Sequence, residues 1–520
     1  MTISGWEKGL LGNLAPLSTF SVAHVAGLFI LFTCLYFIRN IYFHPLSQHP
    51  GPKLWAANRL PWCFHQYRGN LSRRLCELHK RYGPVVRIAP DEISYISVDA
   101  WKTIYGQRSA EMPKDPNFSL LTPSGVQNIL TADRETHTRQ RRLLSHAFSE
   151  KALREQEQIL QNYCTKLCSQ LEDRSYSGPV DLFDWYTFAT FDLIGDLAFG
   201  KSFGCLDSGM PSPFVESIKS GSRELMLNQM LRYYGILFVR SLLPLLGLGG
   251  VAGSRAANMR RAIETVRARI ARGPTADRKD FWHYVLGHMA DNDGSGVGVH
   301  DSKTTMTEAE MYANAFSISI AGSEGTATAL SGATFLLLRH PDAYRQAVKE
   351  VRDAFVAETD MTAANMAGKL PFLDAVLNES MRLYPPVAIT LPRRVPEGGE
   401  TVDGRFVPAG YTVGVNHLAC YRSELNFEDP DAFRPERWLL NGNTSGGSSA
   451  EAFKPFSHGP RACLGKNLAW AELRLILSRM LWRFDMQLVE TEANLKWLDE
   501  QKLWGFWAKP PLLCRLVPVR

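Results

Sequence analysis

The sequence contains one long apolar run, residues 307–338, that has the pattern of a single helix. It starts with TEAE, in which Thr307 and Glu310 have the spacing of a capping box. It ends shortly before Pro341, a residue that interrupts a helix. Such a helix spans roughly 48 Å at about 1.5 Å per residue, so a large domain has to be built around it.

The middle of this predicted helix, AGSEGTAT at residues 321–328, is unusual for a packed core. Each of its two glycines costs about 1 kcal/mol relative to alanine in a helix interior. Glu324 also places a carboxylate near the centre of the domain. One interpretation is a tolerated weak spot or a surface face. The other is that a large group passes close to the backbone here.

The remaining pattern is mainly helical. Further helices are predicted at residues 68–83, 132–147, 151–173, 182–199, 254–272 and 277–291. Residues 85–98 alternate between apolar and polar and break at Pro90, which indicates a hairpin, and short β-like runs return at 387–415 and 485–520. With 45% hydrophobic residues, the chain can bury a large core. We expect one large, mostly α domain with a minor β region over residues 55–520, interrupted by a surface loop at 441–452.

Charge and cysteine usage exclude several classes of protein. The 58 basic and 52 acidic residues give a formal net charge of +6, and no dense basic block with interleaved aromatic residues occurs. We therefore expect no nucleic-acid partner. The nine cysteines include no CxxC pair. This pattern fits neither a zinc nor a disulfide framework and suits a reducing compartment.

The N-terminus carries an uncharged apolar run at residues 22–38. A cleaved signal peptide is the alternative, but the run is long and lacks a small-residue cleavage site. We predict a membrane anchor over residues 1–43 with a transmembrane helix at about 20–38. Arg39 and Lys53 follow it, which places the rest of the chain in the cytoplasm. Residues 44–54 contain three prolines and predict a stiff, extended hinge.

One cysteine has unusual neighbours. Cys463 lies in FSHGPRACLG, residues 456–465, directly before a strongly helical run. The amino end of a helix stabilises a thiolate. Zinc would need more soft ligands than the nearby His458, and a catalytic nucleophile would need a partner base. A haem group fits better, with the sulfur as axial ligand and Arg461 on a propionate.

Two propionates require more cations, and four short motifs offer them. These are HTRQR at residues 137–141, ESMR at 379–382, LPRR at 391–394 and FRPERW at 433–438. In ESMR a carboxylate and a guanidinium share one helix face. Each motif alone is weak evidence, because charged residues at helical spacing usually form a solvated face.

Taken together and in this order, these motifs resemble those of the cytochrome P450 family of haem-thiolate monooxygenases. The resemblance covers the anchor, the hinge, the glycine-containing helix and the cysteine motif. It implies the cytochrome P450 fold and haem b as cofactor. The residues implied to hold the haem are Cys463 as iron ligand, with Phe456, Arg461, Gly465, Arg393, Arg141 and His137. It also implies that Glu379, Arg382 and Arg437 form a structural ion-pair triad.

The hinge and the C-terminal residues are similar to fungal microsomal members, including the trichothecene hydroxylase-like group. This implies a single-pass protein of the endoplasmic reticulum membrane that oxidises a lipophilic terpenoid, polyketide or alkaloid. Electrons would come from a separate NADPH reductase, with cytochrome b5 as an optional donor, docking near Arg434, Lys454 and Lys466. The alternatives are non-hydroxylating haem-thiolate chemistry, such as desaturation, coupling or isomerisation, and a non-catalytic haem-binding protein.

The resemblance assigns two further features. Family members usually have threonine directly after the acidic residue of the central helix, whereas here Gly325 follows Glu324. We expect Glu324 to deliver protons with help from Thr326 or Ser323 through water, or else the substrate's own hydroxyl takes that role. The substrate pocket is expected at residues 109–130, before Arg240, at 385–391 and at 504–506. Residues 241–251 are expected to dip into the membrane.

Overall fold

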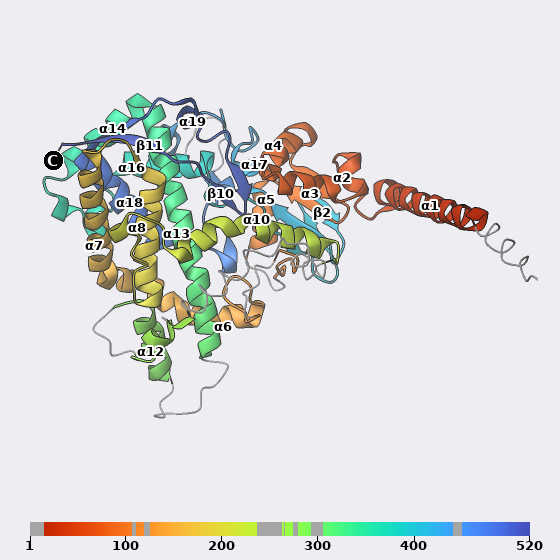
Figure 1. Ribbon diagram of the computed structural model, residues 1–520, viewed down its shortest axis with the longest axis horizontal. Helices are drawn as coiled ribbons and strands as arrows, with labels where there is room; N and C mark the ends of the chain where they lie inside the picture. The colour runs from red at the N-terminus through yellow and green to blue at the C-terminus, as the bar shows by residue number, and fades with distance from the viewer. Residues whose placement is uncertain are drawn as a thin grey trace, which may run out of the picture.

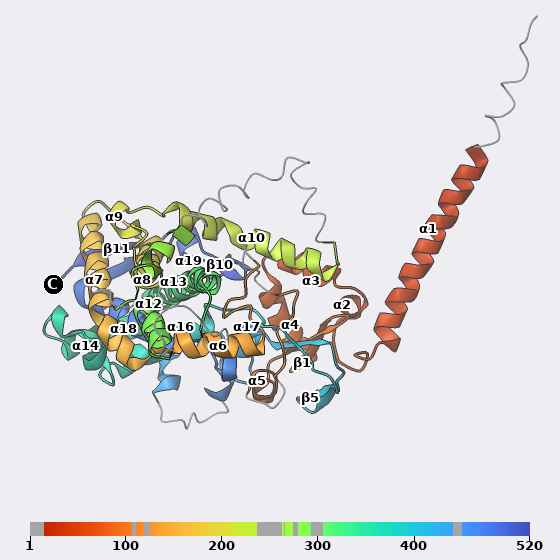
Figure 2. The same ribbon diagram turned by 90° about the horizontal axis from the view of Figure 1, so that it is seen from below.

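In the computed structural model the chain is 59% helical, with small sheets, and the predicted fold class is confirmed. The structure describes residues 15–106, 111–118, 125–236, 263–264, 266–273, 279–292, 305–439 and 450–519. The expected membrane-dipping stretch 241–251 and most of the 441–452 loop lie outside them. Helix α1, Ala15–Ile38, projects from the body as a rod (Figures 1 and 2).

The segment after α1 joins the body closely. A π-helix, Arg39–Phe43, follows, and Asn40 donates a hydrogen bond to the Ala57 carbonyl at 2.9 Å. Val22–Phe43 is the one described helical stretch that is long and apolar enough to cross a membrane. The extended conformation predicted for residues 44–54 is wrong, because Ser47 N–H donates to His44 O at 2.8 Å in a turn. Burial of the Leu46 side chain favours this packed turn over a free spacer.

Helix α13, Glu308–Arg339, runs through the centre of the body (Figure 1). Thr307 caps it, and Glu310 completes the predicted capping box. Helix α8, Leu182–Phe199, packs along it and is buried on almost every side, as expected for a helix that is apolar all round. Helices α16, Pro371–Leu383, and α18, Lys466–Arg483, also contact α13.

The other main helices surround this centre. They are α2 Lys53–Ala57, α3 Leu60–Tyr67, α4 Leu71–Tyr82, α5 Val98–Tyr105, α6 Arg134–Ser145, α7 Glu150–Ser175, α10 Pro213–Tyr233, α12 Phe281–Asn292, α14 Pro341–Ala354 and α17 His417–Tyr421. Helices α2 and α3 lie at the end of the body next to α1, whereas α7 and α14 lie at the opposite end (Figures 1 and 2).

In the part of the chain that the structure describes, the β structure forms two small sheets and two hairpins. Strands β1 Val85–Ala89, β2 Glu92–Tyr95, β7 Thr412–Val415 and β4 Arg393–Arg394 form one sheet in that order. The predicted hairpin is the antiparallel β1–β2 pair, while β2 and β7 are parallel. The second sheet has the order β3 Val180–Asp181, β11 Leu513–Pro518, β8 Phe484–Leu488. The hairpins are β5 Glu400–Val402 with β6 Arg405–Val407, and β9 Lys502–Trp504 with β10 Phe506–Ala508.

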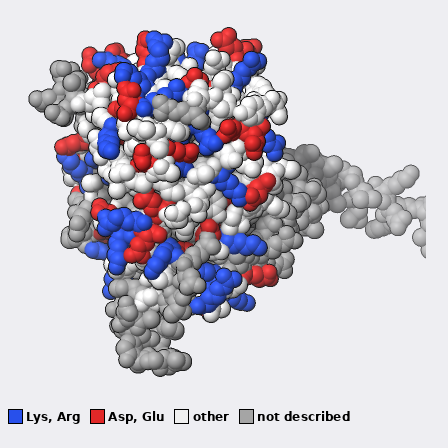
Figure 3. Space-filling model, turned by 90° about the vertical axis from the view of Figure 1, so that its left-hand side faces the viewer, with Lys and Arg blue, Asp and Glu red and all other residues white. Residues whose placement is uncertain are grey.

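The side of the body remote from α1 carries acidic and basic side chains intermingled with uncharged ones (Figure 3). Such mixing agrees with the mild net charge of +6 and keeps single-sign fields small on this face.

Candidate active site

The loop that carries Cys463 is fixed by close backbone contacts. Gly459 has φ +74°, and a Cβ there would lie 1.9 Å from the Tyr105 carbonyl oxygen, so only glycine fits. Further along, the Cys463 N–H donates to the Phe456 carbonyl at 2.8 Å, which closes the loop. Helix α18 then begins at Lys466, and its amino end follows Cys463 directly.

The Cys463 thiol is accessible on one side while protein packs around the rest. Burial raises its pKa, and the Gly465 N–H together with Arg141 and Lys466 only partly offsets this effect. The amino end of the helix therefore does not by itself make Cys463 a thiolate, contrary to the expectation from sequence. A coordinated metal ion deprotonates a thiol, so the ligand role of Cys463 does not depend on a low pKa in the metal-free chain.

Two further residues of the cysteine motif are Phe456 and Gly465. The half-buried Phe456 ring lies 6.3 Å from the Trp470 ring of α18, measured between centroids. A Cβ on Gly465 would meet Phe148 at an ordinary 3.7 Å. Protein contacts alone therefore do not require glycine at position 465, and a group approaching the sulfur is a better reason for it.

Basic side chains from distant segments meet beside this loop. Arg461 donates to Glu111 and, at 2.8 Å, to the Ala132 carbonyl. Arg393 of β4 lies 3.4 Å from the same Glu111 oxygen and donates to the Met112 carbonyl at 3.2 Å. Lys114 forms a β-bridge with Arg393, and burial followed by repulsion from Arg461 and Arg393 lowers its pKa to about 7.

Helix α6 supplies the other two predicted haem-binding residues. Arg141 donates to the Ala462 carbonyl at 2.7 Å, next to Cys463. His137 is buried, and burial together with Arg461, Lys114, Arg141 and Arg393 lowers its pKa to about 3. His137 is therefore neutral at physiological pH and can donate one ring N–H.

This set of side chains suits haem. Among the described residues the cluster joins four basic side chains, Arg461, Arg393, Lys114 and Arg141, with one carboxylate, Glu111. Arg461 and Arg393 are buried, and such an excess of positive charge favours bound anions. The two propionates of haem meet that need, and the nearby Cys463 sulfur meets the need of its iron.

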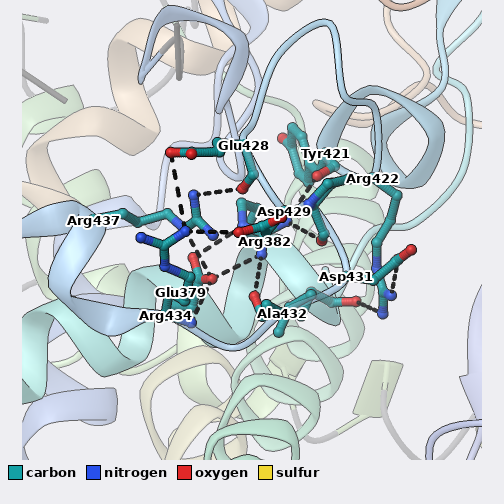
Figure 4. Close-up of polar contacts among 12 residues, drawn as sticks. Glu379, Arg382, Tyr421, Arg422, Glu428, Asp429, Asp431, Ala432, Arg434 and Arg437 are labelled. Atoms are coloured by element: carbon teal, nitrogen blue, oxygen red, sulfur yellow. Dashed lines mark hydrogen bonds and ion pairs between the residues drawn. The ribbon is translucent and has the colours of Figure 1, made fainter. Parts of the chain in front are cut away.

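The three residues predicted as an ion-pair triad are in direct contact (Figure 4). Glu379 and Arg382 have no exposed side-chain surface, and Arg437 Nε donates to Glu379 Oε1 at 3.0 Å. Arg382 also donates to the backbone carbonyls of Tyr421, Pro430 and Ala432. Burial alone would raise the pKa of Glu379, but the Arg382 and Arg437 contacts lower it. The triad thereby joins α16 to the chain that leads into the cysteine loop.

The structure does not bring the three candidate catalytic side chains of α13 together. Ser323 and Thr326 donate to the carbonyls of Ser319 and Gly322, each four residues earlier. Glu324 instead contacts the ammonium group of Lys509. A Cβ on Gly325 would have no other atom within 4 Å, so α13 faces open space there. The interpretation that a large group passes this part of the helix fits that opening.

The sequence interpretation missed several residues at the site. Lys509 is a single cation in the apolar stretch WGFWAKPPLL. A lone charge among apolar residues is the sequence feature that could have identified it as a buried, paired lysine. Glu472 lies among apolar α18 positions, and burial raises its pKa to about 8 despite a hydrogen bond with Thr326. Lys114 and Glu111 belong to an irregular segment, where no periodic pattern marks them.

Comparison with known proteins identifies the family. The family model described as Cytochrome P450 matches residues 50–514. The chain belongs to the cytochrome P450 family. It is 42% identical to "Cytochrome P450 monooxygenase aclL" of Aspergillus oryzae, covering 98% of this chain and 100% of the relative. It is 39% identical to "Averantin hydroxylase" of Dothistroma septosporum, covering 95% of this chain and 90% of the relative. It is 40% identical to "Cytochrome P450 monooxygenase stcF" of Emericella nidulans, covering 93% of this chain and 96% of the relative.

Family membership confirms the predicted enzyme class and cofactor. This cytochrome P450 is a monooxygenase, an oxidoreductase with a thiolate-ligated haem iron. A redox partner and a lipophilic substrate follow from the same membership. Its N-terminal apolar helix is a candidate membrane anchor. The closer placement with trichothecene hydroxylases stays a prediction.

Proposed function

We propose that the enzyme hydroxylates a lipophilic fungal secondary metabolite at the endoplasmic reticulum membrane, with electrons from a separate NADPH-cytochrome P450 reductase. The observation that carries the proposal is the partly accessible Cys463 thiol beside a buried cationic cluster. Relatives that include an averantin hydroxylase at 39% identity support the substrate class.

The side chains have distinct roles in this proposal. When bound, haem supplies an iron centre that activates O2. Cys463 would ligate its iron through sulfur, with Phe456 and Gly465 shaping the space around it. Arg461, Arg393 and Arg141 would hold the propionates as cations, Lys114 would add an N–H donor, and neutral His137 would add a hydrogen bond. The triad Glu379, Arg382 and Arg437 keeps the cysteine loop in place.

The proposed pocket wall includes two of the expected segments. Trp507 of β10 donates to the Pro385 carbonyl at 2.9 Å, which joins the C-terminal hairpin to the start of residues 385–391. Trp504 of β9 donates to the Tyr67 carbonyl at 3.0 Å and lies beside α3. Their aromatic and aliphatic side chains suit an apolar substrate. The expected segment 109–130 is described only at 111–118 and 125–130.

Spectroscopy tests the ligand role of Cys463 directly. The reduced enzyme with carbon monoxide should show the difference band of thiolate ligation, and Cys463→Ala should lose both the band and all NADPH-dependent turnover. Cys34→Ala is the control, because this cysteine is exposed on α1 far from the site. A normal band in Cys463→Ala would exclude the assigned ligand.

Averantin serves as the first substrate probe, since it is named in two of the relatives. Conversion to a product with one added oxygen, dependent on NADPH, reductase and O2, would support hydroxylation. An averantin-dependent product lacking the added oxygen would favour desaturation or coupling. This chemistry is the second candidate, because Gly325 offers no hydroxyl beside Glu324.

The docking site is proposed at the exposed Lys466, at the start of α18, together with Lys454. Arg434 already contacts Asp429 at 3.0 Å, so it is the least available of the three predicted docking residues. Lys466→Glu should slow reduction by the reductase and flatten its salt dependence. The control is Lys349→Glu on α14, because the Lys349 side chain is 76% exposed. Equal reduction rates in the two variants would remove Lys466 from the docking surface.

A further inference from the structure

Residues 128–132 form a tight turn that is organised by the Asn128 side chain. The Asn128 Oδ1 accepts the Leu130 N–H at 2.9 Å, and the Asn128 carbonyl accepts the Ala132 N–H at 2.8 Å. The Asn128 side chain is buried, and its Nδ2 donates to the Ser317 hydroxyl of α13 at 2.6 Å. One buried amide therefore both closes the turn and attaches it to the central helix.

Two further buried side chains hold the same segment. Asn314 of α13 accepts the Ile129 N–H through its Oδ1 at 2.9 Å. Its Nδ2 donates to Gln140 Oε1 of α6 at 3.2 Å, and Gln140 Nε2 donates to the Gln127 carbonyl at 3.1 Å. Asn314 and Gln140 are fully buried. A buried polar group that loses its partner costs about 1–3 kcal/mol, so this network favours one position of the turn.

Basic side chains beside the cysteine loop hold the later residues of the turn. Lys114 donates to the Leu130 carbonyl, and Arg461 donates to the Ala132 carbonyl at 2.8 Å. Both side chains belong to the basic cluster near Cys463. The turn therefore bridges that cluster and α13.

The α13 face that holds the turn also carries the open part of the helix. Four residues share this face, at spacings of three, four and four: Asn314, Ser317, Ala321 and Gly325. Ala321 is exposed although α13 runs through the centre of the body, and a Cβ on Gly325 would meet no other atom within 4 Å. From Ser317 to Gly325 the helix rises about 12 Å at 1.5 Å per residue. The turn therefore stands at one end of this open stretch of helix.

We propose that Asn128, Ser317 and Asn314 are positioning residues that fix the turn 128–132 as a wall against the substrate and thereby decide which substrate atom is oxidised. This rests on the proposed function, in which a lipophilic substrate lies along the open stretch of α13. A displacement of the substrate by about 1 Å can change a rate 100-fold, so the site of attack depends on where the wall stands. A purely structural network would lower the stability of its variants without changing how ligands bind.

The first test uses a matched pair of serines on α13. Ser317 and Ser319 are both buried and donate to the carbonyl four residues earlier, at 2.9 and 2.8 Å, while Ser317 additionally accepts from Asn128. Ser317→Ala and Ser319→Ala are compared as full-length ferric holoenzymes. The shift of the haem absorption band measures the Kd of imidazole and of the bulky azole clotrimazole.

The two azoles separate the wall from the haem. Imidazole binds the iron without reaching the wall, so its Kd should be unchanged in both variants. Clotrimazole fills the space up to the wall, so its Kd should rise at least threefold in Ser317→Ala and keep the wild-type value in Ser319→Ala. A wild-type clotrimazole Kd in Ser317→Ala would overturn the proposal, whatever the thermal midpoint of that variant.

A double variant checks that the Ser317 hydroxyl acts through Asn128. Asn128→Ala should weaken clotrimazole binding at least as much as Ser317→Ala does, and the double variant should bind it as weakly as Asn128→Ala alone. Additive losses would contradict the assignment. If Asn128→Ala does not take up haem, the comparison of Ser317→Ala with Ser319→Ala decides alone.

Turnover of averantin gives a second readout. Ser317→Ala and Asn314→Ala should change the ratio of averantin products oxidised at different positions at least twofold, while Ser319→Ala should keep the wild-type ratio. An unchanged ratio in Ser317→Ala would overturn the proposal. Azole binding needs neither reductase nor O2, so a wild type that shows the expected azole results and does not oxidise averantin counts against the proposed function alone.

Discussion

Arg382 donates from Nε and Nη2 to both carboxylate oxygens of Glu379, at 2.9 and 2.8 Å, and neither side chain has exposed surface. Their spacing of three residues on α16 puts them on one helix face. The pair is shielded from water, so each partner depends on the other for compensation of its charge.

Glu379→Ala should therefore destabilise the holoenzyme by about 3–5 kcal/mol, because it leaves the Arg382 and Arg437 charges buried beside each other. Urea unfolding of the ferric enzyme measures this loss. The control is Asp353→Ala on α14, whose ion pair with Lys349 is exposed and worth at most about 0.5 kcal/mol. Equal midpoints for the two variants would show that the triad is not a structural support.

Acid should weaken the contact between α6 and α13. Glu310 of α13 is bound by Arg139 of α6 at 2.6 Å. Burial alone would raise its pKa, but the bonds from Arg139, the Thr307 backbone and Gln140 lower it from 4.5 to about 2. A lowered pKa in the folded state gives stability that is complete above about pH 4.5 and is lost toward pH 2.

The free energy of unfolding of the wild type, measured with denaturant between pH 7 and 4, should therefore begin to fall as the pH approaches 4. Glu310→Gln should be less stable at pH 7 and show a smaller decrease. Glu492→Gln, at an exposed helical pair with Lys496, serves as the control. An unchanged pH slope in Glu310→Gln would contradict the assignment.

Position 325 should accept side chains at no structural cost. A Cβ there meets no other atom within 4 Å, so Gly325→Ala should raise stability by up to about 1 kcal/mol through helix propensity. Gly332→Ala on the same helix should lose about 1–3 kcal/mol, since its Cβ would lie 2.5 Å from Tyr384 Cδ1. Thermal unfolding of both variants compares these effects.

Gly325→Thr restores the residue usual in the family. It should lower peroxide release if, in the wild type, a water molecule serves in place of the missing hydroxyl. Thr326→Ala should raise it if Thr326 orders that water. A silent Thr326→Ala together with a new product from Gly325→Thr would mean that Gly325 shapes the substrate space and that Thr326 is not part of the relay.

Two truncations separate anchoring from packing. Removal of residues 1–38 should reduce membrane retention in a sedimentation assay and leave haem binding intact, because the Asn40 contacts with Ala57 and Arg87 remain. Removal of residues 1–43 should reduce membrane retention equally. It should also lower the free energy of unfolding by about 1 kcal/mol or more per lost hydrogen bond. Full retention without residues 1–38 would point to a second membrane contact.

Local sequence was sufficient for several elements of the fold. The capping box at Thr307, the hairpin at Pro90 and the apolar run of α1 are signals carried by neighbouring residues, and each matches an element of the structure. The spacing in ESMR likewise put Glu379 and Arg382 together, because a helix fixes which residues share a face.

Tertiary structure alone decided which distant charges meet. Lys509 reaches Glu324 across 185 residues of sequence, and Arg461 reaches Glu111 across 350. It also turned Thr326 toward Glu472 of α18. It packed residues 44–49 as turns where the prolines of 44–54 predicted an extended hinge. The physical reason is that a side chain's charge state and partner depend on what the whole fold brings within a few ångströms and removes from water, and no short stretch of sequence contains that information.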